Sequence, residues 1–305
     1  MRVGLIGTGP WASSVHAASL AQHPSIEFAG VWGRDPARTA DLSSKFGARA
    51  YADPERLMDE VDALSFAVPP AVQADLALLA ARRGCHVLLE KPIATSVLDA
   101  RRLEAEVAAA GVASIVFFTH RFIAGTQAWL ERVRERGGLF CARAEIAFSV
   151  PLNDGAQAQS AWRREYGALW DLGPHALSLL VPLLDEVTAV VAGAGRGDQV
   201  HLILQHPRNC SSSASVSLTA PPAGTGTHLY ADGEDGRQTL PKPSLENTRV
   251  VAAHQAALDA LIDLAQHPQR GHPCDVHLGA RVVEVLDAAQ RSLASGCRVA
   301  VSVTQ

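Results

Sequence analysis

Lys91 stands out chemically because the chain uses lysine so sparingly. Of its 27 basic residues only three are lysines, Lys45, Lys91 and Lys242. Arginine stays protonated in proteins, whereas a desolvated lysine can give up its proton. Lys91 lies in Glu90-Lys91-Pro92, at the end of the apolar run Val87–Glu90. If that run is a parallel strand, Lys91 stands at the edge of the sheet where ligands bind. We interpret it as a catalytic residue; the alternative is a surface lysine.

Asp171 and His175 form a second candidate group within Gly-Ala-Leu-Trp-Asp-Leu-Gly-Pro-His, residues 167–175. Pro174 suits the first turn of a helix, which predicts Asp171 just before that helix and His175 inside its first turn. Both side chains are then expected to face one cleft. Oxidation of an alcohol requires a proton acceptor beside the hydride acceptor, and histidine titrates near neutral pH. The alternative is a capping aspartate and a structural histidine.

A short glycine-containing segment near the amino terminus fits the dinucleotide-binding pattern G-x-G-x-x-G/A. It follows a predicted strand, Val3–Ile6, and opens a predicted helix, Trp11–Ala21. The first glycine permits the tight turn, and the second lets backbone N–H groups approach a pyrophosphate at the start of the helix. The alternative is an ordinary strand–turn–helix. The predicted binding residues are Gly7, Thr8, Gly9, Pro10, Trp11 and Ala12.

The end of the second predicted strand selects between NAD and NADP. Enzymes that use NAD place Asp or Glu there to bind the ribose 2′-hydroxyl. Here the position is Gly33, and it is followed by Arg34 and, one helical turn later, by Arg38. Guanidinium groups bind a 2′-phosphate well, so we expect NADP(H) to be preferred and NAD(H) to be possible. Asp35 complicates this choice, but Pro36 after it indicates a helix N-cap.

Strands and helices alternate through residues 1–119, which predicts βαβ units and a doubly wound parallel sheet of the Rossmann type. Besides Phe28–Trp32, strands are expected at Asp62–Val68 and Ser114–Thr119. Helices are expected after Asp35-Pro36 and Asp53-Pro54, and at Val72–Arg83 and Val97–Ala110. Each of the first two starts with an aspartate N-cap and a proline. Val68 and Glu90 then lie at strand ends and are expected to line the cofactor pocket.

The alternation stops after His120, which indicates a second, α+β domain over residues 120–305 with a mostly antiparallel sheet. A helix is expected at Asp275–Leu293, and Val299, Val301 and Val303 alternate as a last strand. Loops are expected at Leu152–Ser160 and Pro221–Thr227. Further strands are expected at Ala142–Val150, Thr188–Ala194, Val200–Leu204 and Ser212–Leu218.

Composition excludes several classes of function. The 305 residues are 48% hydrophobic and 19% charged, with a formal net charge of −4, so a folded protein is expected that attracts neither nucleic acid nor an anionic membrane. The first residues lack the features of a signal peptide, and no apolar run looks long enough to span a bilayer. Five widely spaced cysteines without C-x-x-C suit a reducing cytoplasm. No metal site is expected, because His272, Cys274 and His277 have no second ligand pair.

The sequence resembles the Gfo/Idh/MocA oxidoreductases, the family of glucose–fructose oxidoreductase and inositol 2-dehydrogenase. The joint occurrence of E-K-P and G-x-x-x-D-x-x-x-H at this separation is specific, and the resemblance extends over nearly the whole chain. It rests on GTGPWA (7–12), AVPPAVQ (67–73), GCHVLLEKP (84–92), GALWDLGPH (167–175) and SLASGCRVAV (292–301).

The resemblance implies a role for each matching residue. Lys91 would orient the substrate and assist proton transfer, His175 would be the acid/base, and Asp171 would bind the substrate. Pro69 would line the nicotinamide pocket. It further implies that substrate binds against the sheet of the second domain, whose other face commonly forms the interface of a homodimer or homotetramer. Further substrate contacts are expected from Arg121, Trp162 and Arg163, and Arg163 and Arg164 have the alternative of being solvated loop charges.

Two departures from the family concern the substrate. Gln73 stands where members often have histidine, and His120 stands where asparagine often precedes Arg121. The expected function is hydride transfer between a nicotinamide cofactor and a secondary alcohol or ketone of a sugar, a cyclitol or a related small polar molecule. One alternative is a reductase of a non-sugar carbonyl or a dihydrodiol, which Trp162, Tyr166 and Trp170 keep open. An alternative of another class is a non-catalytic NADP-binding sensor or regulatory protein.

Overall fold

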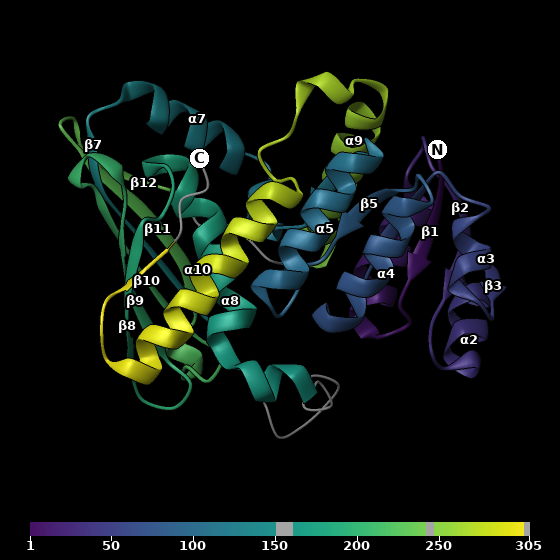
Figure 1. Cartoon of the computed structure of the whole chain (residues 1–305), viewed down its shortest axis with the longest axis horizontal. Coiled ribbons are helices and arrows are strands. Elements are labelled where there is room, and N and C mark those ends of the chain that lie inside the picture. Colours follow the sequence, from purple (N-terminus) through teal and green to yellow (C-terminus); the bar gives the residue numbers. More distant parts are fainter. Residues whose placement is uncertain (151–160, 242–246, 302–305) are drawn as a thin grey trace. The chain divides into compact units, whose positions relative to one another are not determined.

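The computed structural model describes residues 1–150, 161–241 and 247–301. The chain divides into two compact units (Figure 1). The first contains Met1–Ile123 and Leu245–Ala280, and the second contains Ala124–Ser244 and Arg281–Gln305. This differs from the division expected at residue 120, because a later segment returns to the first unit.

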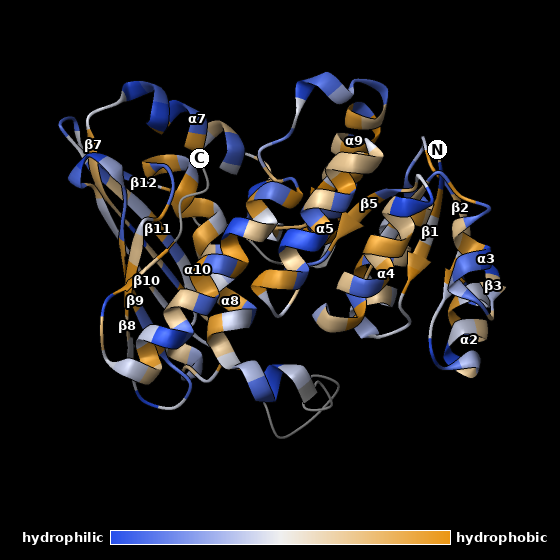
Figure 2. Ribbon diagram, in the orientation of Figure 1, coloured by the Kyte–Doolittle hydropathy of each residue, from blue (hydrophilic) through white to orange (hydrophobic). Residues whose placement is uncertain are grey.

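The first unit contains a six-stranded parallel sheet in the order β3-β2-β1-β4-β5-β6. This is the strand order of a Rossmann fold. From β1 the chain adds β2 and β3 on one side of the sheet, and it then adds β4, β5 and β6 on the other side. Figure 2 shows β1 and β5 as hydrophobic strands, as expected for a parallel sheet. The strands are β1 (Arg2–Ile6), β2 (Glu27–Trp32), β3 (Arg49–Tyr51), β4 (Ala63–Phe66), β5 (His86–Leu89) and β6 (Ser114–Val116).

The helices of the first unit follow the predicted signals closely. Asp35 and Asp53 cap the helices that begin at Pro36 and Pro54, as predicted. Asp35 accepts hydrogen bonds from Ala37 N and Arg38 N, and Asp53 accepts one from Glu55 N. The first helix opens as a π-helix, η1 (Ala12–Ala17), and continues as α1 (Ala18–Gln22). The others are α2 (Pro36–Phe46), α3 (Pro54–Met58), α4 (Pro70–Arg82), α5 (Val97–Ala110) and α6 (Thr119–Phe122).

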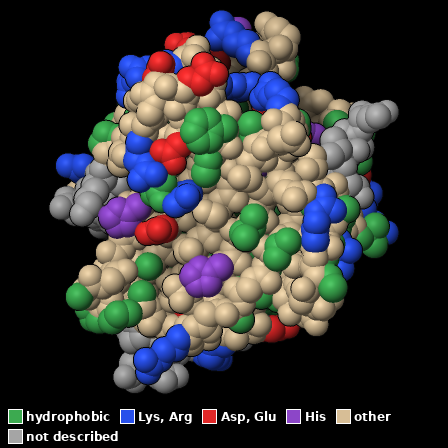
Figure 3. Space-filling view, turned by 90° about the vertical axis from the view of Figure 1, so that its left-hand side faces the viewer, with side chains coloured by type: hydrophobic (Ala, Val, Ile, Leu, Met, Phe, Trp, Pro, Cys, Tyr) green, Lys and Arg blue, Asp and Glu red, His purple; other side chains and the backbone are tan. Residues whose placement is uncertain are grey.

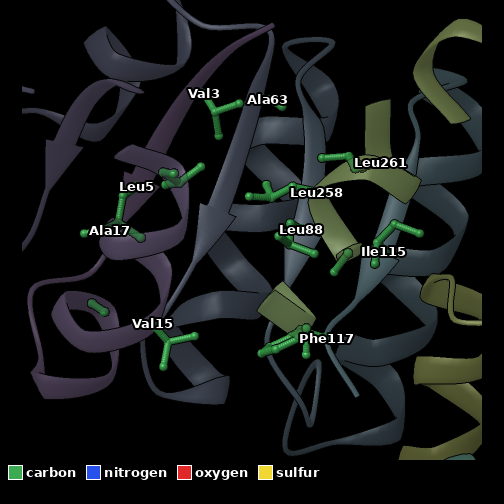
Figure 4. Packing of buried hydrophobic residues seen from close by; sticks show 14 of the residues in the cluster. Val3, Leu5, Val15, Ala17, Ala63, Leu88, Ile115, Phe117, Leu258 and Leu261 are labelled. Carbon is green, nitrogen blue, oxygen red and sulfur yellow. The ribbon is translucent and has the colours of Figure 1, made fainter. Parts of the chain in front are cut away.

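Helix α9 (Asn247–Gln266), which the sequence analysis did not predict, completes the first unit. Its Leu258 and Leu261 are fully buried in one cluster with Val15 and Ala17 of η1 and with strand residues (Figure 4). The strand residues are Val3, Leu5, Ala63, Leu88 and Ile115, and Phe117 follows β6. This burial explains why residues 245–280 join a sheet whose last strand ends at Val116. A 3-10 turn, η4 (Pro268–Arg270), follows.

The second unit contains a seven-stranded sheet in the order β12-β11-β7-β10-β9-β8-β13. Only β7 and β10 pair in parallel, so the expectation of a mostly antiparallel sheet is confirmed. Its strands are β7 (Leu139–Ala147), β8 (Ala189–Ala194), β9 (Val200–Gln205), β10 (Ser211–Ser217), β11 (Gly226–Gly233), β12 (Gly236–Thr239) and β13 (Val299–Ala300). The helical segments are α7 (Thr126–Arg136), α8 (Ala161–Leu184), and the short η2 (Pro207–Asn209) and η3 (Pro222–Gly224).

In this part of the chain the structure differs from some of the elements predicted from the sequence. The expected loop Pro221–Thr227 contains η3 and the start of β11. The expected loop Leu152–Ser160 and the strand residue Val303 lie outside the described residues. Helix α10 (Val276–Ser295) starts one residue after the predicted start, because Asp275 caps it: Asp275 Oδ1 accepts a hydrogen bond from Leu278 N at 3.0 Å.

Helix α8 begins earlier than predicted and changes direction inside. Gly167 has φ 62° and ψ −163°, a conformation that side chains rarely allow, and helical structure lies on both sides of it. Asp171 and Pro174 therefore both lie within the helix. The predictions that Asp171 precedes the helix and that Pro174 lies in its first turn are wrong. The Trp162–Leu184 stretch is also long and apolar enough to cross a membrane, which the sequence analysis did not expect. Of its most apolar window 83% is buried in the protein, as in a core helix.

Candidate active site

The glycine turn between β1 and η1 has the geometry of a dinucleotide-binding turn. Gly7 has φ +132°, and a Cβ there would lie 2.3 Å from Ala67 O, so only glycine fits. A Cβ at Gly9 would enter open space, with nothing within 4 Å. The backbone at Gly9 is thus open to a ligand at the start of the first helix, where a pyrophosphate is stabilised. Val68 borders the turn, because a Cβ at Gly7 would also lie 3.3 Å from Val68 Cγ1.

The end of β2 lacks both a carboxylate and the room for one. A Cβ at Gly33 would lie 2.6 Å from Thr8 Cγ2 and 3.1 Å from Thr39 Oγ1. Asp35 is occupied as the N-cap of α2, since its Oδ1 accepts from Ala37 N and Arg38 N at 3.0 and 3.2 Å. Arg34 and Arg38 are exposed beside it. Arg38 Nε lies 3.4 Å from Asp35 Oδ2, so the Asp35 carboxylate is engaged at both oxygens, and two guanidinium groups face one carboxylate at this strand end.

The Glu90-Lys91-Pro92 turn is held from two sides. Buried Gln73 of α4 donates from Nε2 to Glu90 O at 2.7 Å and accepts at Oε1 from Glu90 N at 2.8 Å. The Glu90 carboxylate accepts from Trp11 Nε1 at 2.6 Å and from Lys91 N at 3.1 Å. Gln73 thus fixes the backbone that carries Lys91.

His120 and Arg121, in α6, lie in the same unit as Lys91 and are buried. Burial lowers the pKa of His120 to about 4, and the positive charge of Lys91 acts in the same direction, so this imidazole stays neutral at physiological pH. Burial likewise lowers the pKa of His272 to about 4, and the positive charge of Arg121 acts in the same direction. Neutral His120 therefore adds no positive charge beside Lys91.

Asp171 and His175 lie in the second unit, one turn apart on α8, and are 5% and 8% exposed. Residues four apart on a helix share a face, so the two side chains lie on the same side of α8 although neither begins the helix. The kink at Gly167 brings Arg163 back toward Asp171, with Nε 2.8 Å from Oδ2. Arg163 also lies over the Trp162 ring, with Cζ 5.4 Å from the centroid.

The remaining predicted residues have different surroundings. Arg164 is exposed, consistent with a solvated charge. Tyr166 and Trp170 pack edge to face with centroids 5.5 Å apart, and Trp170 Nε1 donates to Gln290 at 2.8 Å. Trp170 is thus a core residue rather than a ring exposed to substrate. Among the described residues no cluster of His, Cys, Asp and Glu could hold a metal ion.

Sequence reasoning missed two buried histidines near Glu90. His16 Nε2 lies 3.2 Å from Glu90 Oε1, and His254 Nε2 lies 3.0 Å from His16 Nδ1. His16 had a weak signal, as a polar residue in the apolar part of the helix after the glycine turn. His254 had none, because it lies on the unpredicted α9, 238 residues away.

Together, the strand order, the glycine turn and the Glu90-Lys91-Pro92 turn at the sheet edge define a nicotinamide-dependent oxidoreductase with a Rossmann domain. Comparison with known proteins adds a family match for the amino-terminal part of the chain. Residues 1–118 match the family described as "Oxidoreductase family, NAD-binding Rossmann fold", GFO_IDH_MocA.

Curated relatives extend the match over most of the chain. A dTDP-3,4-didehydro-2,6-dideoxy-alpha-D-glucose 3-reductase of Streptomyces antibioticus is 28% identical over 289 residues, 88% of this chain and 85% of the relative. A D-xylose 1-dehydrogenase (NADP(+)) 2 of Haloferax volcanii is 28% identical over 71% of this chain and 64% of its own.

Solved structures share the fold of the whole chain. GenD2 from gentamicin A biosynthesis, in complex with NAD, has a TM-score of 0.86 at 23% identity, covering 99% of this chain and 97% of its own. A myo-inositol dehydrogenase of Corynebacterium glutamicum has a TM-score of 0.84 at 21% identity, covering 100% and 99%. Residues 1–118 thus match the Gfo/Idh/MocA family of oxidoreductases, and the whole chain shares the fold of these solved structures.

Proposed function

We propose that this oxidoreductase prefers NADP(H) and moves a hydride between the nicotinamide and a secondary alcohol or ketone of a sugar, a cyclitol or a related small polar molecule. The observation that carries the proposal is the bond from Trp11 of the glycine turn to Glu90, 2.6 Å long. It ties the dinucleotide-binding turn to the turn that carries Lys91. The nicotinamide, when bound, accepts or supplies the hydride.

We propose that Lys91 and His175 act on the same substrate oxygen. In the oxidising direction His175 takes the hydroxyl proton while the carbinol carbon gives up its hydride. The ammonium of Lys91 stabilises the developing alkoxide, and Asp171 binds and orients the substrate. In the reducing direction His175 returns the proton to the oxygen. Val68, Pro69 and Glu90 line the cofactor site in this proposal.

The preference for NADP(H) rests on the end of β2. A carboxylate at Gly33 would collide with Thr8, Asp35 is engaged as an N-cap, and Arg34 and Arg38 are exposed beside it. Titration of both reduced cofactors by fluorescence tests this directly. We expect tighter binding of NADPH and a loss of roughly 10- to 100-fold of that preference in Arg34→Ala, as for a charge-assisted contact. Equal affinities in the unmodified enzyme would refute the preference.

The substrate class rests on the relatives and on polar side chains of the proposed site. Several curated relatives are named for reactions of sugars and sugar nucleotides. Arg121, Trp162 and Arg163 are proposed to contact a hydroxylated or anionic ring, and Arg163 already binds the Asp171 carboxylate at 2.8 Å. The partly exposed Trp162 and Tyr166 keep a non-sugar carbonyl or dihydrodiol as the alternative.

A non-catalytic NADP-binding sensor is the alternative of another class. NADPH oxidation measured against ketoses, inosose and simple carbonyl compounds separates the two. Turnover with at least one carbonyl, lost in His175→Ala, is expected of the enzyme. Tight cofactor binding without turnover across the panel would favour the sensor.

We further propose that the protein is a cytoplasmic homodimer or homotetramer, formed through the outer face of the second unit's sheet. All five cysteines are free, as in a reducing compartment. Figure 3, which faces the side of the second unit that carries this sheet, shows hydrophobic side chains among charged ones and histidines. Phe140 and Ile203 on β7 and β9 are 56% and 57% exposed. Light scattering should show more than a 32.2 kDa monomer at micromolar concentration.

A further inference from the structure

Four fully buried polar side chains form a connected group behind Glu90: Ser19, Ser65, His16 and His254 are each 0% exposed. His16 Nδ1 lies 2.8 Å from Ser65 Oγ and 3.0 Å from His254 Nε2. The other nitrogen of His254 lies 2.5 Å from Ser19 Oγ. Buried imidazoles are costly unless hydrogen-bonded, so a group bonded at every nitrogen restricts where its protons can lie. Its open end is Glu90, 3.2 Å from His16 Nε2.

The fold dictates which residues meet here. The π-helical turns of η1 carry His16 toward the strands, and π-helical turns occur frequently at functional sites. Ser65 comes from β4, and His254 comes from α9, whose apolar residues pack on the same side of the sheet. Phe117 closes the group, with its ring centroid 4.9 Å from that of His254. The group thus excludes water, and its hydrogen bonds are made within the first unit.

The protonation of His254 limits where the other protons of the group can lie. Burial lowers its pKa well below 6.5, and the neighbouring His16 and His23 act in the same direction. His23 itself contacts Asp259 of α9 at 3.1 Å, on the solvent side. His254 therefore stays uncharged, and only one of its two ring nitrogens carries a proton.

Two proton arrangements satisfy the group. If Ser19 donates to His16 O, 3.0 Å away, His254 donates to Ser19 and accepts from His16 Nδ1. If Ser19 donates to His254 instead, His254 donates to His16 Nδ1. Both oxygens of Glu90 accept from groups that can only donate, Trp11 Nε1 and Lys91 N, which favours the ionised carboxylate. In the second arrangement His16 Nδ1 accepts, so the single proton of a neutral His16 lies on Nε2, the nitrogen that faces the ionised Glu90. In the first arrangement Nδ1 is protonated, and a proton on Nε2 as well makes His16 an imidazolium paired with that carboxylate.

We propose that His16, supported by His254, is a positioning residue whose Nε2–H holds the Glu90 carboxylate between the glycine turn and the backbone of Lys91. This inference rests on the proposed function, in which Lys91 must meet the nicotinamide in a fixed geometry. The carboxylate accepts from Trp11 on one side and from Lys91 N on the other, so its orientation sets the register of the two turns. Small displacements of a catalytic group reduce turnover strongly, which gives His16 an effect without contact with substrate.

A matched pair of substitutions separates this role from simple packing. His16→Gln keeps an amide N–H near the position of Nε2, and His16→Asn keeps a polar group near Nδ1. We expect His16→Asn to lower kcat roughly 10- to 100-fold, as for the loss of a hydrogen bond to a charged group, with KM for NADPH changed less. His16→Gln should retain kcat within about threefold. Equal losses in both variants, at equal thermal stability, would overturn the proposal.

A second measurement does not depend on turnover or on the stability of those variants. In protein labelled with ¹⁵N-histidine, the Nε2 of His16 should stay protonated from about pH 6 to pH 8, and Glu90→Gln should weaken its hydrogen-bond signature. An unprotonated Nε2 across this range would overturn the positioning role even in an active enzyme. A protonated Nε2 in a protein without turnover would instead refute the proposed function and leave the hydrogen-bonded group intact.

Discussion

Gly33 has two roles at the end of β2. It removes the carboxylate that would bind the ribose of NAD, and it makes room for Thr8 of the glycine turn, which a Cβ would approach to 2.6 Å. In the proposed preference for NADP(H), the choice of cofactor therefore depends on the contact between two loops. A change of cofactor preference would require both loops to change.

We expect Gly33→Asp alone to weaken binding of both NADPH and NADH, because the new side chain displaces the glycine turn. Thr8→Ala removes both Thr8 atoms in the clash, Cγ2 and Oγ1. The double variant Thr8→Ala/Gly33→Asp should therefore bind NADH better than Gly33→Asp does, and Thr8→Ala alone is the control. Fluorescence titration of the four proteins measures this. Tighter NADH binding by Gly33→Asp alone than by the double variant would show that the clash is relieved elsewhere.

Local signals at single residues predicted much of this site. The glycine turn, the aspartate caps and the Glu90-Lys91-Pro92 turn each depend on neighbours within a few positions, so the sequence displays them directly. The contacts that hold Glu90 do not. Gln73 is 17 residues from Glu90, and His254 is 238 residues from His16. No local pattern encodes such pairings, which depend on how helices pack on the sheet.

At the scale of elements, one glycine changes the direction of α8 and thereby brings two side chains of the helix into contact. The proline at 174 suggested a helix start, but the break lies at Gly167, seven residues earlier. That break lets Arg163 reach Asp171, eight positions along the chain. Along a straight helix eight residues span about 12 Å, so the contact requires the change of direction.

Gly167→Ala should lower the free energy of unfolding by about 1–3 kcal/mol, because φ 62° with ψ −163° is accessible essentially to glycine alone. It should also reduce kcat/KM by releasing Asp171 from Arg163. Gly224→Ala is the control, since a Cβ there meets only an ordinary contact, 3.5 Å from Pro221 Cγ. Urea unfolding and steady-state kinetics on both variants are the measurements. Equal effects of the two substitutions would contradict this account of the kink.

At the scale of the whole molecule, the two units differ from a simple division of the chain into halves. The strand–helix alternation correctly located the parallel sheet, but α9 lies far beyond it in sequence and still supplies part of the same core. The helical periodicity of its apolar residues could have identified α9 as a helix. It could not have identified the sheet on which α9 packs, because periodicity shows which face of a helix is buried but not which element covers it.

Two histidines that are wholly or partly shielded from water, His120 and His272, make the stability of the protein depend on pH. Burial is the largest cause lowering the pKa of His120 and of His272 to about 4, against 6.5 in an unfolded chain. The unfolded chain thus binds protons that the folded one does not, so stability should fall as pH drops from about 6.5 to about 4. Asp275 opposes this near the acid end, because burial raises its pKa.

Urea unfolding at a series of pH values checks this expectation. His272→Asn keeps an acceptor for Cys274 N, which donates to His272 Nδ1 at 3.1 Å, but removes the titrating ring. The variant should lose less stability on acidification than the unmodified protein. A matched change at exposed His201 controls for the loss of a histidine. An unchanged pH dependence in His272→Asn would show that other groups carry it.

The central claim is that a hydride passes between the nicotinamide and a substrate carbon with help from Lys91 and His175. The most direct test follows deuterium from NADPH labelled at the nicotinamide C4 into the alcohol product of an active ketone. Label should appear at the carbinol carbon, and Lys91→Ala and His175→Ala should each reduce the rate roughly 100- to 10,000-fold with cofactor affinity nearly unchanged. Label that never reaches the product, or rates within a few fold of the unmodified enzyme in either variant, would contradict the account.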